Sequence, residues 1–525
     1  MSSREADLAY ELLLEHYGKI VADVARFLLQ NGWQPLKYIA LKTNMKIDQV
    51  RKALCLLIQH KLAKFHVRKK RLVEYEIELR NVMAILFHPK FIYTAKLLYG
   101  DTAELIVEET LQHGIIQMST VIKNVAERLS DEAETLKIEN AFKDLVKTHF
   151  LQRFVQEAEI EKSENDDEIV PNFTQKETDL YLIPHLSAEC NFPLKRRRSN
   201  DGNDEPQAKR FKSDNGDISA LEDDGVYWSV NISRFLQFFR DQSIVSSVTH
   251  RYGTSCGEIV RAMLRISEVT TSANAPTTQP ISGAEISRSL PQKLGLPVEH
   301  VDQHLKLLLN DDEKIVELFD DAGGGGLYVV NLKNSAFALS TATVLSYVLQ
   351  RYGSKACRIF RLLILKKHLE QKQVEEFAMI PPKEAKGYLY HMLAENMVIM
   401  QEVPRTPDHA PSRTFYLFSV DIQRLSRMLL VRCYKTCTNL ITKRKDLNET
   451  NRRILEKQER ITAIKASLQD ADEAQLEEID EIMTSSERTT LSNHQHCCNK
   501  LHTAQNQLLN TIFVLDSYLN SLGAE

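Results

Sequence analysis

The feature that most constrains the fold of this chain is a change of hydrophobic period within residues 34–79. Apolar residues first recur at helical spacing, in residues 35–42 and again in residues 47–60. From Phe65 onward the spacing becomes two, and apolar residues alternate on both sides of a basic turn, Lys69-Lys70-Arg71. A helix, a turn, a second helix and a β-hairpin in this order predict a winged helix.

The same outline returns along the chain, which indicates a tandem array rather than one large core. At 525 residues the chain is long enough for several domains. The fold class we predict is mainly α with small β-hairpin wings: four tandem winged-helix domains followed by a C-terminal antiparallel coiled coil. The expected domains are winged helix 1 (1–80), winged helix 2 with a long acidic wing (81–186), a disordered linker of basic and acidic residues (187–224), winged helix 3 (225–333), winged helix 4 (334–420) and a coiled-coil hairpin (421–525).

Local patterns give further expectations about individual segments. Residues 6–30 are predicted to form one amphipathic helix, because apolar residues recur there at spacings of three and four. In the second unit, a strand at residues 151–155 is expected to pair with a strand at 179–183, across the acidic stretch 157–168. The long helix of the fourth unit is expected either to be continuous or to break at Gly353.

The last part of the chain, residues 421–525, contains no proline and is predicted to be helical. Leucine and isoleucine recur there at intervals of seven in two segments, with a break near Thr484–Ser486. Two heptad helices separated by a break predict an antiparallel coiled-coil hairpin. The predicted seam residues are Leu440, Leu447, Ile454, Ile461, Leu468, Leu501, Leu508 and Leu515.

Composition excludes several classes of protein. The 67 basic and 71 acidic residues give a net charge of −4, so bulk charge does not make the chain a polyanion binder. No apolar run is long enough to span a membrane, and the acidic N-terminus does not resemble a signal peptide, so we expect no membrane partner. The 8 scattered cysteines favour reduced thiols in the cytosol or nucleus over a disulfide framework.

No motif in the chain predicts catalysis or a cofactor. The sequence has no G-x-S-x-G, no phosphate-binding Gly-Lys-Ser/Thr loop and no H-E-x-x-H. His494, Cys498 and His502 lie on one face of a predicted helix, but a structural zinc site needs four ligands and usually a turn between them. We therefore predict no catalytic residue, no metal and no cofactor.

Two basic clusters lie in the predicted linker, separated by ten residues. This is the spacing of a two-part nuclear import signal, so a nuclear location is expected. Direct contact with DNA and a merely solvated linker are the alternatives. The cluster residues are Lys195, Arg196, Arg197, Arg198, Lys209, Arg210 and Lys212.

DNA reading is the function that a winged helix first suggests. In the first unit, however, residues 53–58 of the second helix are apolar almost all round, which favours a protein-docking surface over base reading. Acidic residues on the second helices of the third and fourth units also disfavour contact with phosphates. The first wing is the better candidate for phosphate contact, and a solvated turn or contact with an acidic protein are its alternatives. The DNA-proximal candidates are Arg68, Lys69, Lys70 and Arg71 in this wing, with Arg405 and Arg413 in the wing of the fourth unit.

Several long stretches resemble a known family, in irregular loops as well as in helices. They are QPLKYIALKTNMKIDQVRKALCLLIQHKL, DDGVYWSVNISRFLQFFRDQSIV, GEIVRAMLRISEVTTSANAPTTQP, EQKQVEEFAMIPPKEAK and PRTPDHAPSRTFYLF. The chain is similar throughout to the large winged-helix subunits of RNA polymerase III, the third-named of its specific subunits, which are distantly similar to the alpha subunit of general transcription factor E.

This resemblance implies a non-catalytic polymerase subunit. It implies a heterotrimer with two other polymerase III-specific subunits, docking on the clamp of the core enzyme, and contact with the polymerase III initiation factor. It also implies a role in transcription initiation and promoter DNA opening for small non-coding RNAs such as tRNA and 5S rRNA, with binding of single-stranded or non-specific DNA. The rival interpretations are a tandem winged-helix trafficking scaffold without a DNA role, and a free sequence-specific transcription factor.

Overall fold

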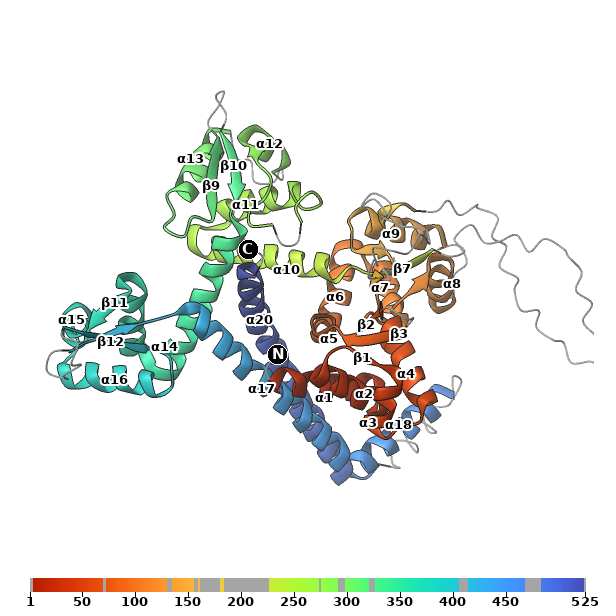
Figure 1. Cartoon of the computed structure of the whole chain (residues 1–525). Helices are drawn as coiled ribbons and strands as arrows, with labels where there is room; N and C mark the ends of the chain where they lie inside the picture. Colours follow the sequence, from red (N-terminus) through yellow and green to blue (C-terminus); the bar gives the residue numbers. More distant parts are fainter. Residues whose placement is uncertain are drawn as a thin grey trace, which may run out of the picture. The chain divides into compact units, whose positions relative to one another are not determined.

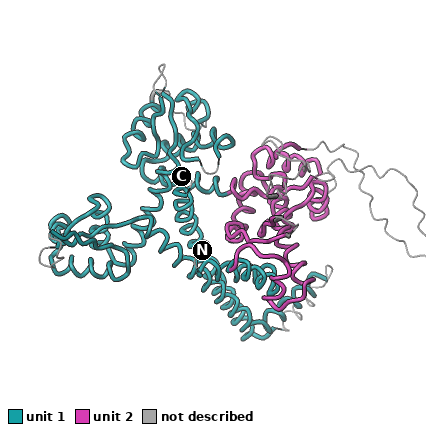
Figure 2. The backbone as a smooth tube through the Cα atoms, viewed as in Figure 1, with its two compact units in different colours: residues 1–30, 236–525 teal, residues 31–235 magenta. Residues whose placement is uncertain are grey.

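The computed structural model describes the chain in two compact units (Figure 2), one of residues 31–235 and the other of residues 1–30 with 236–525. The described residues are mainly helical, and none of their helices is long and apolar enough to cross a membrane. The described ranges are 3–68, 72–129, 135–154, 159–160, 180–183, 226–272, 275–290, 298–320, 326–405, 414–467 and 483–523.

Winged helix 1 contributes its helix-turn-helix and wing to the unit of residues 31–235. Asn44 ends the first of the two helices in the left-handed conformation that asparagine tolerates, with φ 55°. The wing hairpin is antiparallel and pairs Ala63 with Ile77 and Arg68 with Leu72. The elements are β1 (Gln34–Pro35), α3 (Leu36–Thr43), α4 (Ile47–Gln59), β2 (Ala63–Arg68) and β3 (Leu72–Ile77).

Winged helix 2 completes the same unit, and its sheet has the order β4-β7-β5. The core of winged helix 2 contains large, fully buried side chains, among them Trp228, Phe142 and Phe150. The strands therefore pack directly on the helices. The elements are α5 (Leu79–Ala84), η1 (Ile85–Phe87), α6 (His88–Tyr99), α7 (Asp101–His113), β4 (Ile116–Gln117), α8 (Met118–Leu129), α9 (Thr135–Lys147), β5 (Leu151–Arg153), β6 (Glu159–Ile160) and β7 (Tyr227–Val230).

The partner of β5 is not the one that the sequence predicts. β5 pairs antiparallel with β7, from Leu151↔Val230 to Arg153↔Trp228, whereas the described residues 180–183 form no strand. The strand predicted at 179–183 is therefore wrong, and so is a boundary of the third unit at residue 225. Residues 179–183 are the nearest alternating segment in the sequence, which is why they are predicted as the partner. β7 pairs instead because its Trp228 fills the core against Phe142, at a ring-centroid distance of 5.5 Å.

Residues 6–30 form two helices, α1 (Ser3–Tyr17) and α2 (Lys19–Asn31), not the single helix that the sequence predicts. Gly18 separates them with φ 84°, a conformation that glycine adopts at little cost and that helical geometry excludes. The apolar spacing continues across this break, which is why periodicity alone does not reveal it. Both helices present buried aliphatic residues, among them Leu8, Leu13 and Leu28.

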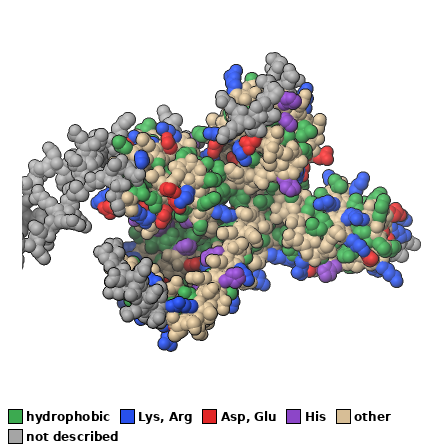
Figure 3. Space-filling model, turned by 180° about the vertical axis from the view of Figure 1, so that it is seen from behind, with side chains coloured by type: hydrophobic (Ala, Val, Ile, Leu, Met, Phe, Trp, Pro, Cys, Tyr) green, Lys and Arg blue, Asp and Glu red, His purple; other side chains and the backbone are tan. Residues whose placement is uncertain are grey.

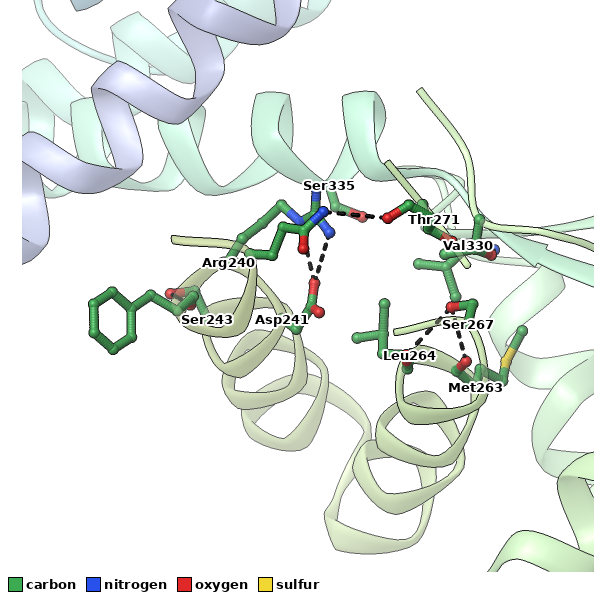
Figure 4. Close-up of polar contacts among 12 residues, drawn as sticks. Arg240, Asp241, Ser243, Met263, Leu264, Ser267, Thr271, Val330 and Ser335 are labelled. Carbon is green, nitrogen blue, oxygen red and sulfur yellow. Dashed lines mark hydrogen bonds and ion pairs between the residues drawn. The ribbon is translucent and has the colours of Figure 1, made fainter. Parts of the chain in front are cut away.

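Winged helix 3 has a core of its own, formed by its helices and its sheet of order β8-β10-β9. The loop that follows α11 is held at several points. Gln237 donates to the carbonyl of Thr271, which is labelled in Figure 4, over 3.3 Å. The Val330 amide donates to Thr278 Oγ1 over 2.9 Å. The elements are α10 (Ile232–Tyr252), α11 (Thr254–Ile266), β8 (Ile281–Ser282), α12 (Gly283–Ser289), α13 (Val298–Leu309), β9 (Val316–Asp320) and β10 (Leu327–Val330).

Winged helix 4 follows the long α14, which is interrupted at Gly353 by a non-helical residue with φ 85°. Of the two expectations for this helix, the break at Gly353 is the correct one. The sheet has the order β11-β13-β12. The elements are α14 (Leu332–Lys366), β11 (His368–Glu370), α15 (Gln371–Ala378), α16 (Pro382–Ala394), β12 (Ile399–Pro404) and β13 (Thr414–Ser419).

The C-terminal helices form a hairpin that packs against both α1 and α14 (Figure 1). Its elements are α17 (Ile422–Thr450), α18 (Arg452–Ser467) and α20 (Ser485–Leu522). Thr484 caps α20, and Glu487 returns the bond in a capping box, which explains the break predicted near Thr484–Ser486. The predicted fold class is confirmed: mainly α, with winged-helix hairpin sheets and a C-terminal helical hairpin.

Candidate docking surfaces and nucleic-acid interface

The first wing ends in the basic turn that the sequence selects as the best candidate for DNA contact. Residues 69–71 lie outside the described residues, and only the backbone of Arg68 is described, as the last residue of β2. Phosphate contact by Arg68, Lys69, Lys70 and Arg71 therefore stays a prediction.

A second segment lies beside this wing, and no pattern in the sequence predicts it. β6 (Glu159–Ile160) pairs in parallel with β2, with Glu159 opposite His66 and Ile160 opposite Val67. β6 lies within the acidic stretch 157–168, so one acidic residue of that stretch, Glu159, is paired to the edge strand of the basic wing. A strand of two residues has no detectable period, and only the opposite charges of the two segments could have suggested this pairing.

The apolar stretch of α4, residues 53–58, is partly buried within its own unit. Ala53, Leu54 and Leu57 are buried within the unit, whereas Cys55 is exposed between them. Arg51 and Lys52 are exposed on the same helix. The unit itself therefore covers part of this apolar stretch, and docking of a partner protein on α4 stays a prediction.

The second helices of winged helices 3 and 4 carry acidic side chains on their outer faces. Asp302 is exposed on α13. On α16, Glu384 forms an ion pair with Lys355, and Glu395 just after the helix lies 3.0 Å from Arg351. Lys383 and Lys386 are exposed on the same helix, so α16 presents mixed charge rather than a basic face to a phosphate backbone.

In the fourth wing, Arg405 is exposed and lies with its guanidinium carbon 4.5 Å from the ring centroid of Phe415. This stacking fixes the guanidinium group next to an aromatic face. Arg413 lies outside the described residues. The nuclear-import residues Lys195, Arg196, Arg197, Arg198, Lys209, Arg210 and Lys212 do as well.

Lys61 connects winged helix 1 to winged helix 2 within the unit of residues 31–235. It follows α4 in the left-handed conformation, with φ 58°, and donates to Ser229 Oγ on β7. Its ammonium group also lies 5.2 Å from the ring centroid of Phe154, and its carbonyl accepts from Asn81 over 2.8 Å. Burial lowers the pKa of Lys61 to about 8, although the charge of Glu78 acts in the opposite direction.

The titration of Lys61 predicts a specific dependence of stability on pH. Because its pKa is lower in the folded protein than in the unfolded chain, the unfolded chain binds more protons between about pH 8 and the ordinary value of 10.5. The free energy of unfolding should therefore rise through this range by about 1–3 kcal/mol from this group. We expect Lys61→Met to abolish this rise in denaturation experiments, and Lys64→Met, a control on an exposed neighbour, to keep it. Identical pH profiles for Lys61→Met and the wild type would show that Lys61 is not buried as a cation.

A buried arginine joins α1 to both long helices of the hairpin. Arg444 on α17 contacts both carboxylate oxygens of Glu15 on α1, at 2.6 and 2.9 Å, and is only 13% exposed. Its other terminal nitrogen donates to Gln505 Oε1 over 2.9 Å and lies 3.3 Å from His502 Nδ1 on α20. Burial and the nearby Arg444 charge lower the pKa of His502. These contacts attach the N-terminal helix to the hairpin.

The side chains considered as metal ligands have other neighbours. His494 Nε2 lies 3.0 Å from Asn448 Oδ1 and 3.5 Å from Cys498 Sγ, whereas His502 faces Arg444. Within the described part of the chain, no group of three or more His, Cys, Asp or Glu side chains is arranged to hold a metal ion.

The predicted seam residues of the hairpin differ in burial. Ile461 and Leu515 are buried, and Leu468 lies outside the described residues. Three buried residues of α17 lie outside the predicted seam: Tyr434, Cys437 and Ile441. They are buried because α17 also packs against α1. The half-buried seam residues are Leu440, Leu447, Ile454, Leu501 and Leu508.

Winged helices in series, followed by a C-terminal helical hairpin, define the class of tandem winged-helix proteins. Family models match four parts of the chain: the RNA polymerase III subunit RPC82 helix-turn-helix domain (residues 7–68), RNA polymerase III subunit RPC82 (139–337), the POLR3C C-terminal winged-helix domain (344–420), and the DNA-directed RNA polymerase III subunit RPC3 helical hairpin domain (453–514).

Curated proteins match the chain over nearly its whole length. DNA-directed RNA polymerase III subunit RPC3 of Bos taurus is 48% identical over 530 residues, and that of Homo sapiens is 47% identical over 531 residues, with 99% of both chains covered in each case. The subunit of Dictyostelium discoideum is 22% identical over 86% of this chain and 93% of its own length. The chain belongs to the RPC3 family of RNA polymerase III subunits.

Proposed function

We propose that this chain is a non-catalytic subunit of RNA polymerase III that acts in transcription initiation and promoter DNA opening. The observation that carries the proposal is the identity of 48% to an RPC3 subunit across 99% of both chains. The tandem winged helices and the hairpin support a scaffold role, since each presents surfaces to other proteins. We assign the chain to a heterotrimer with two other specific subunits, docked on the clamp of the polymerase and in contact with its initiation factor, in the nucleus.

Its proposed role at DNA is contact with the phosphate backbone, mainly of single-stranded or non-specific DNA. The basic first wing and the exposed Arg405 support this role, whereas the ion-paired face of α16 argues against base reading. The transcripts served would be small non-coding RNAs such as tRNA and 5S rRNA. Because the acidic stretch 157–168 includes β6, which pairs with β2, we also expect its charge to weaken DNA contact at the first wing.

Charge reversal of Lys69, Lys70 and Arg71 tests this DNA contact. We expect the variant to bind single-stranded DNA about tenfold more weakly at low salt, because each phosphate that is no longer neutralised removes a counterion-release contribution. The slope of log affinity against log salt should become shallower by about 0.7 for each such phosphate of a single strand. Reversal of Lys37, Lys42 and Lys46, which lie outside the wing, is the control. An unchanged slope in the wing variant would contradict contact by this wing.

Purification of the tagged full-length chain from cells tests the proposed function itself. We expect the catalytic subunits of RNA polymerase III to copurify in fixed proportion with the chain. Copurification of membrane-sorting proteins without polymerase would support the trafficking scaffold instead. Recovery of a strong base motif by the free chain in binding-site selection would support a sequence-specific transcription factor.

A further inference from the structure

A cluster of exposed apolar and basic side chains lies on winged helix 4, where α14 and α15 meet. We call it the α14–α15 patch; its residues are Arg358, Arg361, Leu365, Phe377 and Met379. Leu365 is 76%, Phe377 52% and Met379 86% exposed. Large apolar side chains exposed in one cluster are typical of an interaction site rather than of an ordinary surface. Figure 3 shows hydrophobic and basic side chains intermixed over the winged helix at the right of that view.

A hydrogen bond links the two helices at this patch. Arg358 donates to the carbonyl of Ala378 over 3.1 Å, which places it beside the two neighbours of Ala378 in the chain, Phe377 and Met379. Leu365 follows Arg358 by two helical turns, on the same exposed face of α14. α14 and α15 pack against each other, so one extended partner segment could contact both helices.

Met379 occupies a position whose backbone disfavours methionine. It caps α15 in the left-handed conformation, with φ 52°, where glycine and asparagine are preferred. The corresponding residue after α3 of winged helix 1 is Asn44, with φ 55°. Neither burial nor backbone geometry explains a methionine at position 379. The exposed apolar side chain and the left-handed backbone both cost free energy, which points to a partner that Met379 contacts.

The charge around the patch indicates the chemistry of that partner. Within the described part of the chain, Arg361, Lys366 and Lys367 form no ion pair, and Arg358 is bonded to a backbone carbonyl. Glu375 and Glu376 lie just before Phe377, but the basic residues around the patch outnumber them, so the patch can still attract carboxylates. Phosphates would also suit the arginines, but a nucleic acid backbone gains nothing from an exposed leucine, phenylalanine and methionine, so a protein segment fits better.

We propose that the α14–α15 patch docks a segment of another polymerase III subunit that combines acidic residues with apolar anchors. The apolar anchors would cover Leu365, Phe377 and Met379, and the carboxylates would pair with Arg358 and Arg361. This inference rests on the proposed function, since the partner belongs to the same polymerase.

Crosslinking within the assembled enzyme tests the proposal. Benzoylphenylalanine replaces Phe377 in the tagged full-length chain, the polymerase is purified and irradiated, and the crosslinked peptides are identified by mass spectrometry. We expect a peptide of another polymerase subunit that carries net negative charge and large apolar residues. Crosslinks to nucleic acid alone, to a basic segment or to no partner would overturn the proposal. Failure of the chain to copurify with polymerase would instead overturn the proposed function, and this inference with it.

Met379→Asn separates docking from folding. Because asparagine suits the left-handed backbone, the unfolding midpoint of the variant should stay the same or rise, whereas the crosslink from position 377 should fall at least fivefold. Arg358→Glu with Arg361→Glu should reduce the same crosslink. Leu136→Asn, which removes an exposed leucine from α9, is the matched control and should leave it unchanged. A crosslink that Met379→Asn does not weaken would contradict the role of the patch.

Discussion

Deletion of residues 421–525 will leave a chain that is largely insoluble and that does not assemble with other polymerase subunits. Without the hairpin, α1 loses the helix that it packs against, and Ala336 on α14 is no longer covered by Ile422 and Tyr518. Exposing three buried leucines of α1 alone would cost about 5–9 kcal/mol, which is comparable with the net stability of a domain. Solubility and copurification of the truncated chain measure the effect, and normal assembly would remove the central role of the hairpin.

A point variant tests the same attachment more gently. Arg444→Met should reduce the free energy of unfolding by about 2 kcal/mol, because it leaves Glu15 and Gln505 without their shared cation. Lys443→Met also removes one positive charge, at an exposed neighbouring residue, and should lower the free energy of unfolding by less than about 0.5 kcal/mol. Hydrogen exchange in α1 should accelerate in the first variant only. Equal exchange in both would show that Arg444 does not hold α1.

Gly114→Ala is expected to destabilise the unit of residues 31–235 by about 3 kcal/mol. Gly114 has φ 75°, and a Cβ atom there would lie 2.5 Å from the carbonyl oxygen of Gln59 at the end of α4. Backbone strain contributes about 1–2 kcal/mol and the clash a similar amount. Thermal unfolding should shift downward by roughly 6–12 °C for a unit of this size.

Gly32→Ala is the matched control for this variant. Gly32 also has a positive φ, 67°, but nothing lies within 4 Å of its would-be Cβ atom, so only strain is expected. A loss of stability about half as large should result. The side chain of Gln59 also donates to the carbonyl of His113, beside Gly114. Equal losses of stability in the two variants would show that winged helix 1 and winged helix 2 do not pack closely at Gly114.

Periodicity predicted most helices of this chain because each buries one face. The second helix of winged helix 1, the break at Gly353 and the capped start of α20 all follow from local residue types. The short strands β1, β4, β8 and β11 could not be predicted, since two or three residues carry no period and their pairing is set by the wing strands. The pairing of β5 with β7 depends on the fit of Trp228 in a core formed far away in sequence.

The candidate sites were predicted less completely, because they depend on contacts between distant residues. The sequence identified basic wings from composition, but it could not place acidic β6 beside β2. Arg444 and Lys61 resemble ordinary surface residues in the sequence, and only the structure brings Glu15 and Ser229 to them. Met379 likewise looks like a core residue until its exposure and its backbone conformation are known together.

The central claim is that this chain has no catalytic role and acts when polymerase III opens promoter DNA. It is tested by transcription with polymerase III assembled with and without the chain, on a closed promoter, on the same promoter with a pre-opened bubble, and on a pre-annealed RNA–DNA scaffold. We predict that omission abolishes initiation on the closed promoter, is partly rescued by the bubble and leaves RNA extension on the scaffold unchanged. An equal loss of activity on all three templates would contradict the account.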